Sequence, residues 1–167
     1  MRGIFAIDPG VSTGAAWAVF NNEAPLAVDA FRTMTNQGST TIKGDELSQA
    51  KELFNLWQGF KQICVRQFME PAWVDLVVED FILLPGQHAG GKDGVAPARV
   101  AWAFEGYRQG RCDRWRTQKH CTTVIWQQPA AMKYERQLKN WGVWVRGRQH
   151  ERSAWCHVGA RLMKVMR

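Results

Sequence analysis

Residues 3–20 read Gly-Ile-Phe-Ala-Ile-Asp-Pro-Gly-Val-Ser-Thr-Gly-Ala-Ala-Trp-Ala-Val-Phe, and this stretch decides the fold. Its first apolar run ends in a carboxylate at Asp8, and Pro9-Gly10 is a strong turn signal. A second apolar run follows within a few residues, so we expect strands at 3–8 and 14–20. A connection this short joins antiparallel neighbours, so the sheet opens as a hairpin.

The rest of the chain alternates between helical and strand-like patterns. Asn21-Asn22 forms the next turn signal and predicts a third strand at 25–32, and the polar, Gly-rich segment 35–45 predicts a loop. The remaining expected elements are a helix at 47–68, a strand at 73–79, a helix at 97–109, a strand at 122–126, a short helix at 130–139 and a last helix from about 147 to 166. A three-stranded antiparallel meander followed by parallel strands between helices predicts one α/β domain over 1–167, with a mixed five-stranded sheet flanked by helices.

Composition narrows the class of protein. The chain has 167 residues, of which 46% are hydrophobic, and no apolar run approaches the roughly 18 residues of a membrane span. The first expected strand starts at once, which leaves no room for a signal peptide. The four cysteines show no C-x-x-C spacing. We therefore expect a cytoplasmic protein with reduced thiols and no membrane partner.

Charge is distributed unevenly along the chain. The net charge is +7, yet residues 1–107 carry eight basic and twelve acidic side chains. Residues 132–167 carry nine basic and two acidic ones, and residues 108–120 carry five basic and one acidic. A basic half beside a carboxylate-bearing half indicates a polyanionic partner such as nucleic acid, whereas a merely solubilising surface is the plainer alternative.

Two carboxylates end apolar strands. Asp8 ends the first strand and Glu79 ends the strand at 73–79, so both point out of a sheet edge on a rigid backbone. Asp8 alone is more typical of a turn, where Asp caps the following backbone amides. Together they repel each other unless a cation lies between them, so the pair predicts a divalent metal site.

The last helix carries a polar face that could complete such a site. His150, Ser153 and His157 are spaced by three and four residues and so share one face, while Ala154 and Ala160 allow close approach to the sheet. The alternative is a pair of surface histidines on a basic helix.

These elements, in this order, resemble the RuvC-like Holliday junction resolvases, which have an RNase H-like fold. The resemblance covers nearly the whole chain and rests on Ile7–Gly14 (Ile-Asp-Pro-Gly-Val-Ser-Thr-Gly), Val77-Val78-Glu79, the helix Pro97–Tyr107, Trp126-Gln127-Gln128-Pro129 and His150-x-x-Ser153-Ala154. The chain departs from the family at Ser153, where an acid is usual, and a hydroxyl is a poor ligand for a divalent metal. Phage-encoded and bacterial members provide the closest match, because they use His at the position of His150.

The resemblance implies a homodimeric endonuclease that cuts four-way DNA junctions with two Mg²⁺ or Mn²⁺ ions, one activating water and one stabilising the leaving 3′ oxygen. The catalytic residues would be Asp8, Glu79, His150 and Ser153, and the metal ligands Asp8, Glu79, His150 and His157. Basic side chains would bind the phosphate backbone, namely Lys92, Arg114, Arg116, Lys133, Arg146 and Arg148. The dimer interface would include Val100, Trp102, Ala103 and Phe104, for which ordinary core packing is the alternative.

Three other functions fit parts of the pattern. Ser153 could mark a DNA-binding protein of the same fold that has lost cleavage, which is a binding module rather than an enzyme. An RNase H-like nuclease acting on flaps or forks would show the same motifs. An actin-like sugar kinase shares the Asp-x-Gly opening, but it needs two such domains and a second phosphate loop, for which this chain has no sequence.

Overall fold

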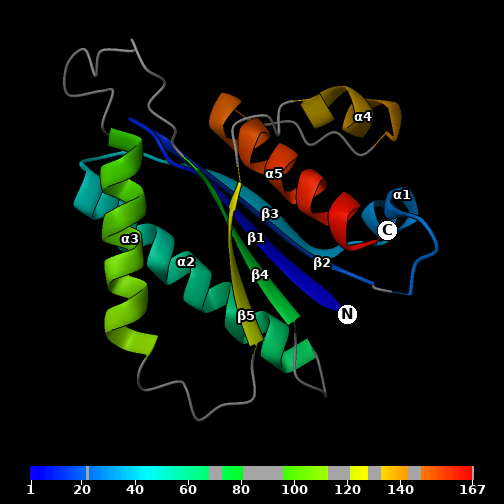
Figure 1. Cartoon of the computed structure of the whole chain (residues 1–167), viewed down its shortest axis with the longest axis horizontal. Helices are drawn as coiled ribbons and strands as arrows, with labels where there is room; N and C mark the ends of the chain where they lie inside the picture. Colours follow the sequence, from blue (N-terminus) through cyan, green and yellow to red (C-terminus); the bar gives the residue numbers. More distant parts are fainter. Residues whose placement is uncertain are drawn as a thin grey trace.

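A computed structural model describes residues 1–21, 23–67, 73–80, 96–112, 121–127, 133–142 and 148–166. Its sheet has five strands in the order β3-β2-β1-β4-β5 (Figure 1). The strands are β1 (Arg2–Asp8), β2 (Thr13–Phe20), β3 (Thr35–Ile42), β4 (Trp73–Glu79) and β5 (Cys121–Gln127). Strand β1 pairs antiparallel with β2 and parallel with β4, while β2–β3 is antiparallel and β4–β5 is parallel. The mixed five-stranded sheet expected from the sequence is confirmed.

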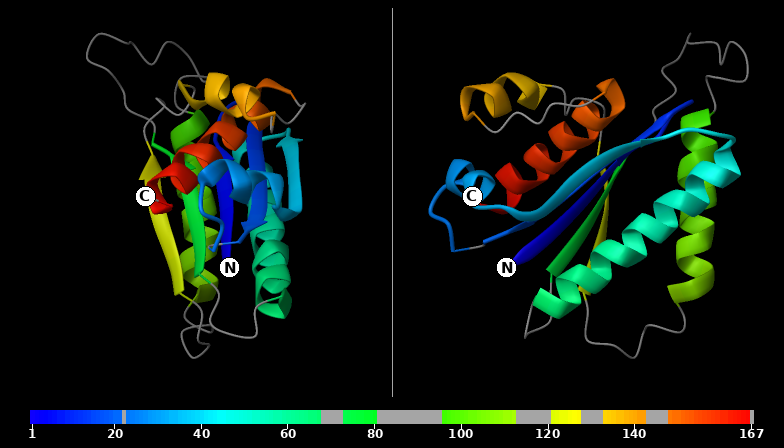
Figure 2. Two further views of the ribbon diagram at one scale, coloured as in Figure 1. Left: turned by 90° about the vertical axis from the view of Figure 1, so that its right-hand side faces the viewer. Right: turned by 180° about the vertical axis from the view of Figure 1, so that it is seen from behind.

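The helices are α1 (Ala27–Arg32), α2 (Glu46–Gln67), α3 (Ala96–Cys112), α4 (Glu135–Asn140) and α5 (Gln149–Val165). In Figure 2, α2 and α3 cover one face of the sheet, and α5 lies on the other with α1 and α4 near it. Alternate residues of β1 serve the two layers: Phe5 and Ile7 pack towards α2 and α3, and Ile4 and Ala6 pack towards α5. Within the described ranges, no helix combines the length and apolar character that crossing a bilayer requires.

The third strand of the meander is not where the sequence predicted it. Residues 25–32 contain helix α1, and the expected loop at 35–45 contains strand β3. Ala30 and Phe31 bury one side of α1 against the α5 face of the sheet. In so short an apolar run, the sequence pattern of a helix cannot be distinguished from that of a strand. Strand β3 was not predicted because it lies at the edge of the sheet and consists mostly of Thr, Ser, Asn and Gln. It therefore lacks the alternation of apolar and polar residues by which strands are recognised.

The layer order brings the functional elements to one edge. Strands β1, β4 and β5 run parallel, so their carboxyl ends, at Asp8, Glu79 and Gln127, meet at the same edge. Helix α5 begins at that edge and is buried along residues 154–160, where Ala154 and Ala160 are almost fully inaccessible. The small residues permit this close approach, as the sequence suggested. The start of α5 thus faces the strand ends.

Candidate metal centre

The centre of the site is a pair of carboxyl groups. Ile7 pairs with Val78 in the parallel register, so the next residues, Asp8 and Glu79, end neighbouring strands. Their side chains are close enough to hydrogen bond to each other. The approach that the sequence predicted for these two strand ends is therefore present.

The two carboxyl groups differ in their protonation. Burial, together with the hydrogen bond to Glu79 and the charge of Glu79, raises the pKa of Asp8 to about 8, against a weaker opposite effect of a hydrogen bond with Ser153. Burial also raises the pKa of Glu79, but the hydrogen bonds with His157 and Asp8 outweigh it, so the pKa of Glu79 lies below its ordinary value. Within the pair, the proton is therefore held by Asp8 in preference to Glu79.

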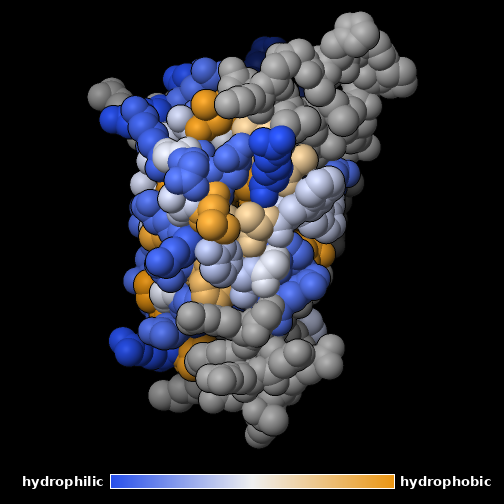
Figure 3. Space-filling view, turned by 90° about the vertical axis from the view of Figure 1, so that its left-hand side faces the viewer, coloured by the Kyte–Doolittle hydropathy of each residue, from blue (hydrophilic) through white to orange (hydrophobic). Residues whose placement is uncertain are grey.

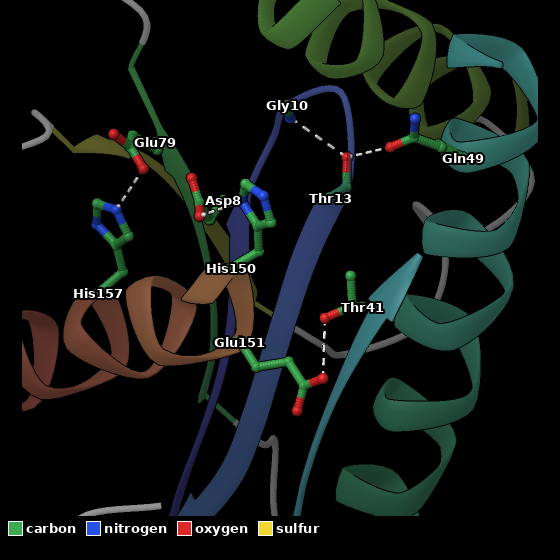
Figure 4. Close-up of polar contacts among 9 residues, drawn as sticks. All are labelled: Asp8, Gly10, Thr13, Thr41, Gln49, Glu79, His150, Glu151 and His157. Atoms are coloured by element: carbon green, nitrogen blue, oxygen red, sulfur yellow. Dashed lines mark hydrogen bonds and ion pairs between the residues drawn. The ribbon is translucent and has the colours of Figure 1, made fainter. Parts of the chain in front are cut away.

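Helix α5 places an imidazole on each carboxyl group (Figure 4). His150 Nδ1 lies 3.3 Å from Asp8 Oδ2, and His157 Nε2 lies 2.9 Å from Glu79 Oε2. The His150 side chain is 39% exposed, whereas that of His157 is fully buried. The other ring nitrogen of His157, Nδ1, has no hydrogen-bond partner among the described residues. All five residues expected at the site from β1, β4 and α5 thus lie together.

Two features fix the first turn of α5 over the sheet. A Cβ on Gly14 would lie 2.1 Å from the backbone oxygen of His150, so only glycine lets the helix start this close to β2. Glu151 points away from the carboxyl pair and accepts hydrogen bonds from Ser39 Oγ and Thr41 Oγ1, at 3.1 and 2.9 Å. Glu151 is therefore an anchor to β3.

The loop after Asp8 is held by a buried amide that the sequence analysis missed. Gln49 of α2 is 1% exposed and accepts a hydrogen bond from Thr13 Oγ1 at 2.5 Å. Its Nε2 donates to the backbone oxygens of Val11 and Gly44, at 2.9 and 2.8 Å. The available signal was a Gln at an inward position of an otherwise apolar helix face. This clamp fixes the turn that follows Asp8 and so restrains the carboxyl group.

A buried ion cluster lies further along the same layer and was also missed. Asp75 of β4 is 1% exposed and accepts from Arg2 Nε at 2.6 Å and Arg161 Nε at 2.9 Å. Arg161 follows His157 by one helical turn, so the cluster fixes α5 against β4 just beyond the site. The signal was a carboxylate inside an apolar strand, which demands a partner when it is buried.

The two carboxyl groups at the site suit a divalent cation by their charge, although the ring nitrogens of His150 and His157 do not point to one common position. Within the part of the chain that the structure describes, no group of three or more His, Cys, Asp and Glu side chains is arranged to hold a metal ion. Each imidazole contacts a different carboxyl group. A cation between Asp8 and Glu79 would neutralise two carboxylates that otherwise must share a proton, and carboxylate oxygens are the ligands that Mg²⁺ prefers.

Comparison with solved structures identifies the fold. A structure of T. thermophilus RuvC in complex with a Holliday junction substrate superposes with a TM-score of 0.53, covering 99% of this chain and 96% of that one at 12% sequence identity. This chain has the RuvC fold. A second structure, of Thermus thermophilus RuvC, gives a TM-score of 0.48 at 13% identity over the same shares. Neither protein-family models nor curated protein sequences give a match.

On this RuvC fold, the residues expected to bind DNA are only partly described. Lys133 and Arg148 are exposed, with the Lys133 ammonium 5.3 Å from the Tyr134 ring centroid. The others lie outside the described residues, namely Lys92, Arg114, Arg116 and Arg146, as does the loop at 85–95. The described part of the expected DNA surface is thus the start of α5 and the approach to α4.

The expected dimer residues on α3 divide into two kinds. Val100 and Phe104 belong to the chain's own core, at 0% and 1% exposure, because they pack against α2 and the sheet. They are core residues here, which is the alternative considered for them, while Ala103 is partly buried. Trp102 is 73% exposed. Figure 3, which faces the side where α3 lies, shows scattered hydrophobic side chains among hydrophilic ones on the coloured surface.

Proposed function

We propose that this chain is a structure-selective DNA endonuclease that cleaves four-way junctions or related branched DNA by metal-dependent phosphodiester hydrolysis. The observation that carries the proposal is the Asp8–Glu79 pair at the carboxyl edge of a RuvC fold. Burying two adjacent carboxylates is unfavourable unless their charge is neutralised, and a bound divalent cation commonly neutralises such a pair in proteins.

The residues divide the work between them. Asp8 and Glu79 would hold the cation, which when bound supplies a polarised water for attack and stabilises the leaving oxygen. His157 holds Glu79 in one orientation, because its fully buried ring contacts Glu79 Oε2 at 2.9 Å. His150, which is part-exposed, is free to turn from Asp8 towards a cation. Ser153 contributes a hydrogen bond to Asp8 in place of the acid usual in this family.

DNA would approach the site across the start of α5. Exposed Arg148 precedes α5, and Arg152 follows one turn later on a segment rich in basic residues. The T. thermophilus RuvC structure that superposes on this chain contains a Holliday junction substrate, which makes branched DNA the first substrate to test. Cutting two strands of a junction symmetrically requires two sites, so we propose a homodimer, with Trp102 the exposed member of the α3 set.

The test uses one labelled four-way junction and a flap, a fork and a linear duplex made from the same strands. Each is incubated with the wild type, with Asp8→Asn and with a matched control, Glu52→Gln, which removes one exposed carboxylate from α2. We expect the wild type and Glu52→Gln to cut branched DNA in Mg²⁺ or Mn²⁺ and not in EDTA. Asp8→Asn should bind the junction at least as tightly and cut nothing.

The outcomes separate the candidate functions. Junction binding without cleavage in either metal would overturn the nuclease proposal. It would favour the alternative of a DNA-binding protein without cleavage, which rests on Ser153 in place of the usual acid. Cleavage of flaps or forks in preference to junctions would assign the alternative substrate. Full cleavage by Asp8→Asn would remove the carboxyl pair from the mechanism.

A further inference from the structure

A third strand-end side chain belongs to this edge. Gln127 is the last residue of β5 and is only 7% exposed. Its side-chain oxygen, Oε1, is buried and has no hydrogen-bond partner among the described residues. A desolvated acceptor without a partner costs free energy, so an orphaned amide oxygen at a functional edge needs an explanation.

Gln127 lies beside Glu79. The two residues are direct partners in the parallel β4–β5 register, and the Asp80 backbone N–H donates to the Gln127 backbone oxygen at 2.7 Å, which fastens the strand ends together. Along β5, Val124 packs with the α2–α3 layer and Ile125 with the α5 layer. Alternation therefore places the Gln127 side chain on the α5 face, the same face as Glu79 and His157.

We propose that Gln127 Oε1 is a neutral oxygen ligand, directly or through one water, for the divalent cation held by Asp8 and Glu79. This inference rests on the proposed function and adds a residue to it. Amide carbonyl oxygens are accepted ligands of hard cations. A Ser hydroxyl is a poor ligand in place of the acid usual at position 153, and the amide would supply a better oxygen ligand, from β5 instead of α5.

The chemistry of the neighbourhood explains why the residue is an amide. Asp8 and Glu79 already end neighbouring strands, and a third carboxylate beside them would add repulsion. Gln adds a ligand without adding charge. A second buried orphan, Trp155 Nε1, is a donor that cannot bind a cation, and Trp155 packs in the hydrophobic layer under α5.

The experiment measures Mn²⁺ binding to the full chain by calorimetry, independently of DNA cleavage. Gln127→Met keeps the length of the side chain and removes the oxygen, and we expect it to weaken Mn²⁺ binding by about 10- to 100-fold, as loss of a supporting ligand does. Gln127→Glu restores an oxygen and should bind within a few-fold of the wild type or tighter. Trp155→Phe removes the orphaned Trp155 Nε1 donor and should leave the affinity unchanged.

The outcomes separate this inference from the proposed function. Equal Mn²⁺ affinity in the wild type and Gln127→Met would overturn the role of Gln127, even if the wild type cuts DNA. Absence of Mn²⁺ binding to the wild type would overturn the proposed function and this inference together. If Gln127→Met does not fold, as judged by circular dichroism, Gln127→Asn replaces it as the test, because it moves the amide oxygen back by the length of one methylene. Wild-type Mn²⁺ affinity in Gln127→Asn would then reject Gln127 as a ligand.

Discussion

Replacing Asp8 by Asn should make the protein more stable at alkaline pH while removing its activity. In the folded chain, burial and the neighbouring Glu79 raise the pKa of Asp8 from its ordinary 3.8 to about 8. The proton on Asp8 therefore stabilises the folded state below its unfolded pKa, and this contribution is lost as the pH rises towards 8. Asn carries a permanent N–H donor for Glu79 and does not titrate, so the variant escapes the loss.

The magnitude follows from the size of the shift. The Asp8 side chain is only 14% exposed, so solvent screens it little. A fully displaced titration changes the free energy of unfolding by about 1.4 kcal/mol per pH unit. Because Asp8 is already half ionised at its pKa of about 8, the change between pH 6 and 8 is roughly 2 kcal/mol. Glu79, whose pKa is lowered, is ionised throughout this window and adds no slope. For a domain of this size, roughly 2 kcal/mol corresponds to a Tm difference of about 4–8 °C.

The assay is thermal unfolding in EDTA at pH 6, 7 and 8 for the wild type, Asp8→Asn and the surface control Glu52→Gln. We expect the Tm advantage of Asp8→Asn over the wild type to grow by about 4–8 °C from pH 6 to pH 8. Adding Mg²⁺ at pH 8 should raise the Tm of the wild type and leave Asp8→Asn nearly unchanged, because the cation replaces the shared proton. Parallel pH curves for the two proteins would refute the carboxyl coupling on which the metal site depends.

Three further outcomes test the geometry around this pair. Ser153→Asp should raise Mg²⁺-dependent cleavage relative to Mn²⁺-dependent cleavage, since Mg²⁺ prefers oxygen ligands, and an unchanged metal ratio in cleavage assays would place residue 153 off the site. Arg148→Ala should reduce the slope of log K for junction binding against log salt by about one, measured by gel shift between 50 and 200 mM salt, and an unchanged slope would remove it from the DNA path. Gly14→Ala should lower the free energy of unfolding, measured by urea denaturation, by about 1–3 kcal/mol, because its Cβ would clash with the His150 backbone. Gly59→Ala, in open space on α2, should not lower it, and equal free energies of unfolding for the two variants would contradict the close packing at Gly14.

The sequence predicted most of the fold because hydrophobic periodicity is strongest where elements are long and buried. Strands β1, β2 and β4 and helix α2 bury nearly continuous or helically spaced apolar residues, and each was located within a few residues. Strand β3 is polar and lies at an edge, so its pairing with β2 depends on the tertiary structure and not on its own pattern.

The site was predictable only where a residue type is unusual at its own position. Asp8 and Glu79 stand at the ends of apolar strands, which the sequence displays directly. The role of Gln49 depends on backbone oxygens of two separate loops, and that of Gln127 on its register with Glu79, so neither is visible before the chain is folded. A buried amide has no fixed spacing relative to the groups it serves.

The two histidines of α5 occupy different environments, and this difference separates their roles. His157 is fully buried on Glu79, and the Asp75–Arg161 contact one turn later fixes the helix there, so its ring stays on the carboxylate. His150 is 39% exposed and touches Asp8 at 3.3 Å, a contact that a cation could displace at little cost. We therefore propose that a cation recruits His150 as a ligand and leaves His157 to orient Glu79. An imidazole in place of a carboxylate shifts metal preference towards Mn²⁺, and the neutral oxygens of Ser153 and Gln127 are too weak to shift it back.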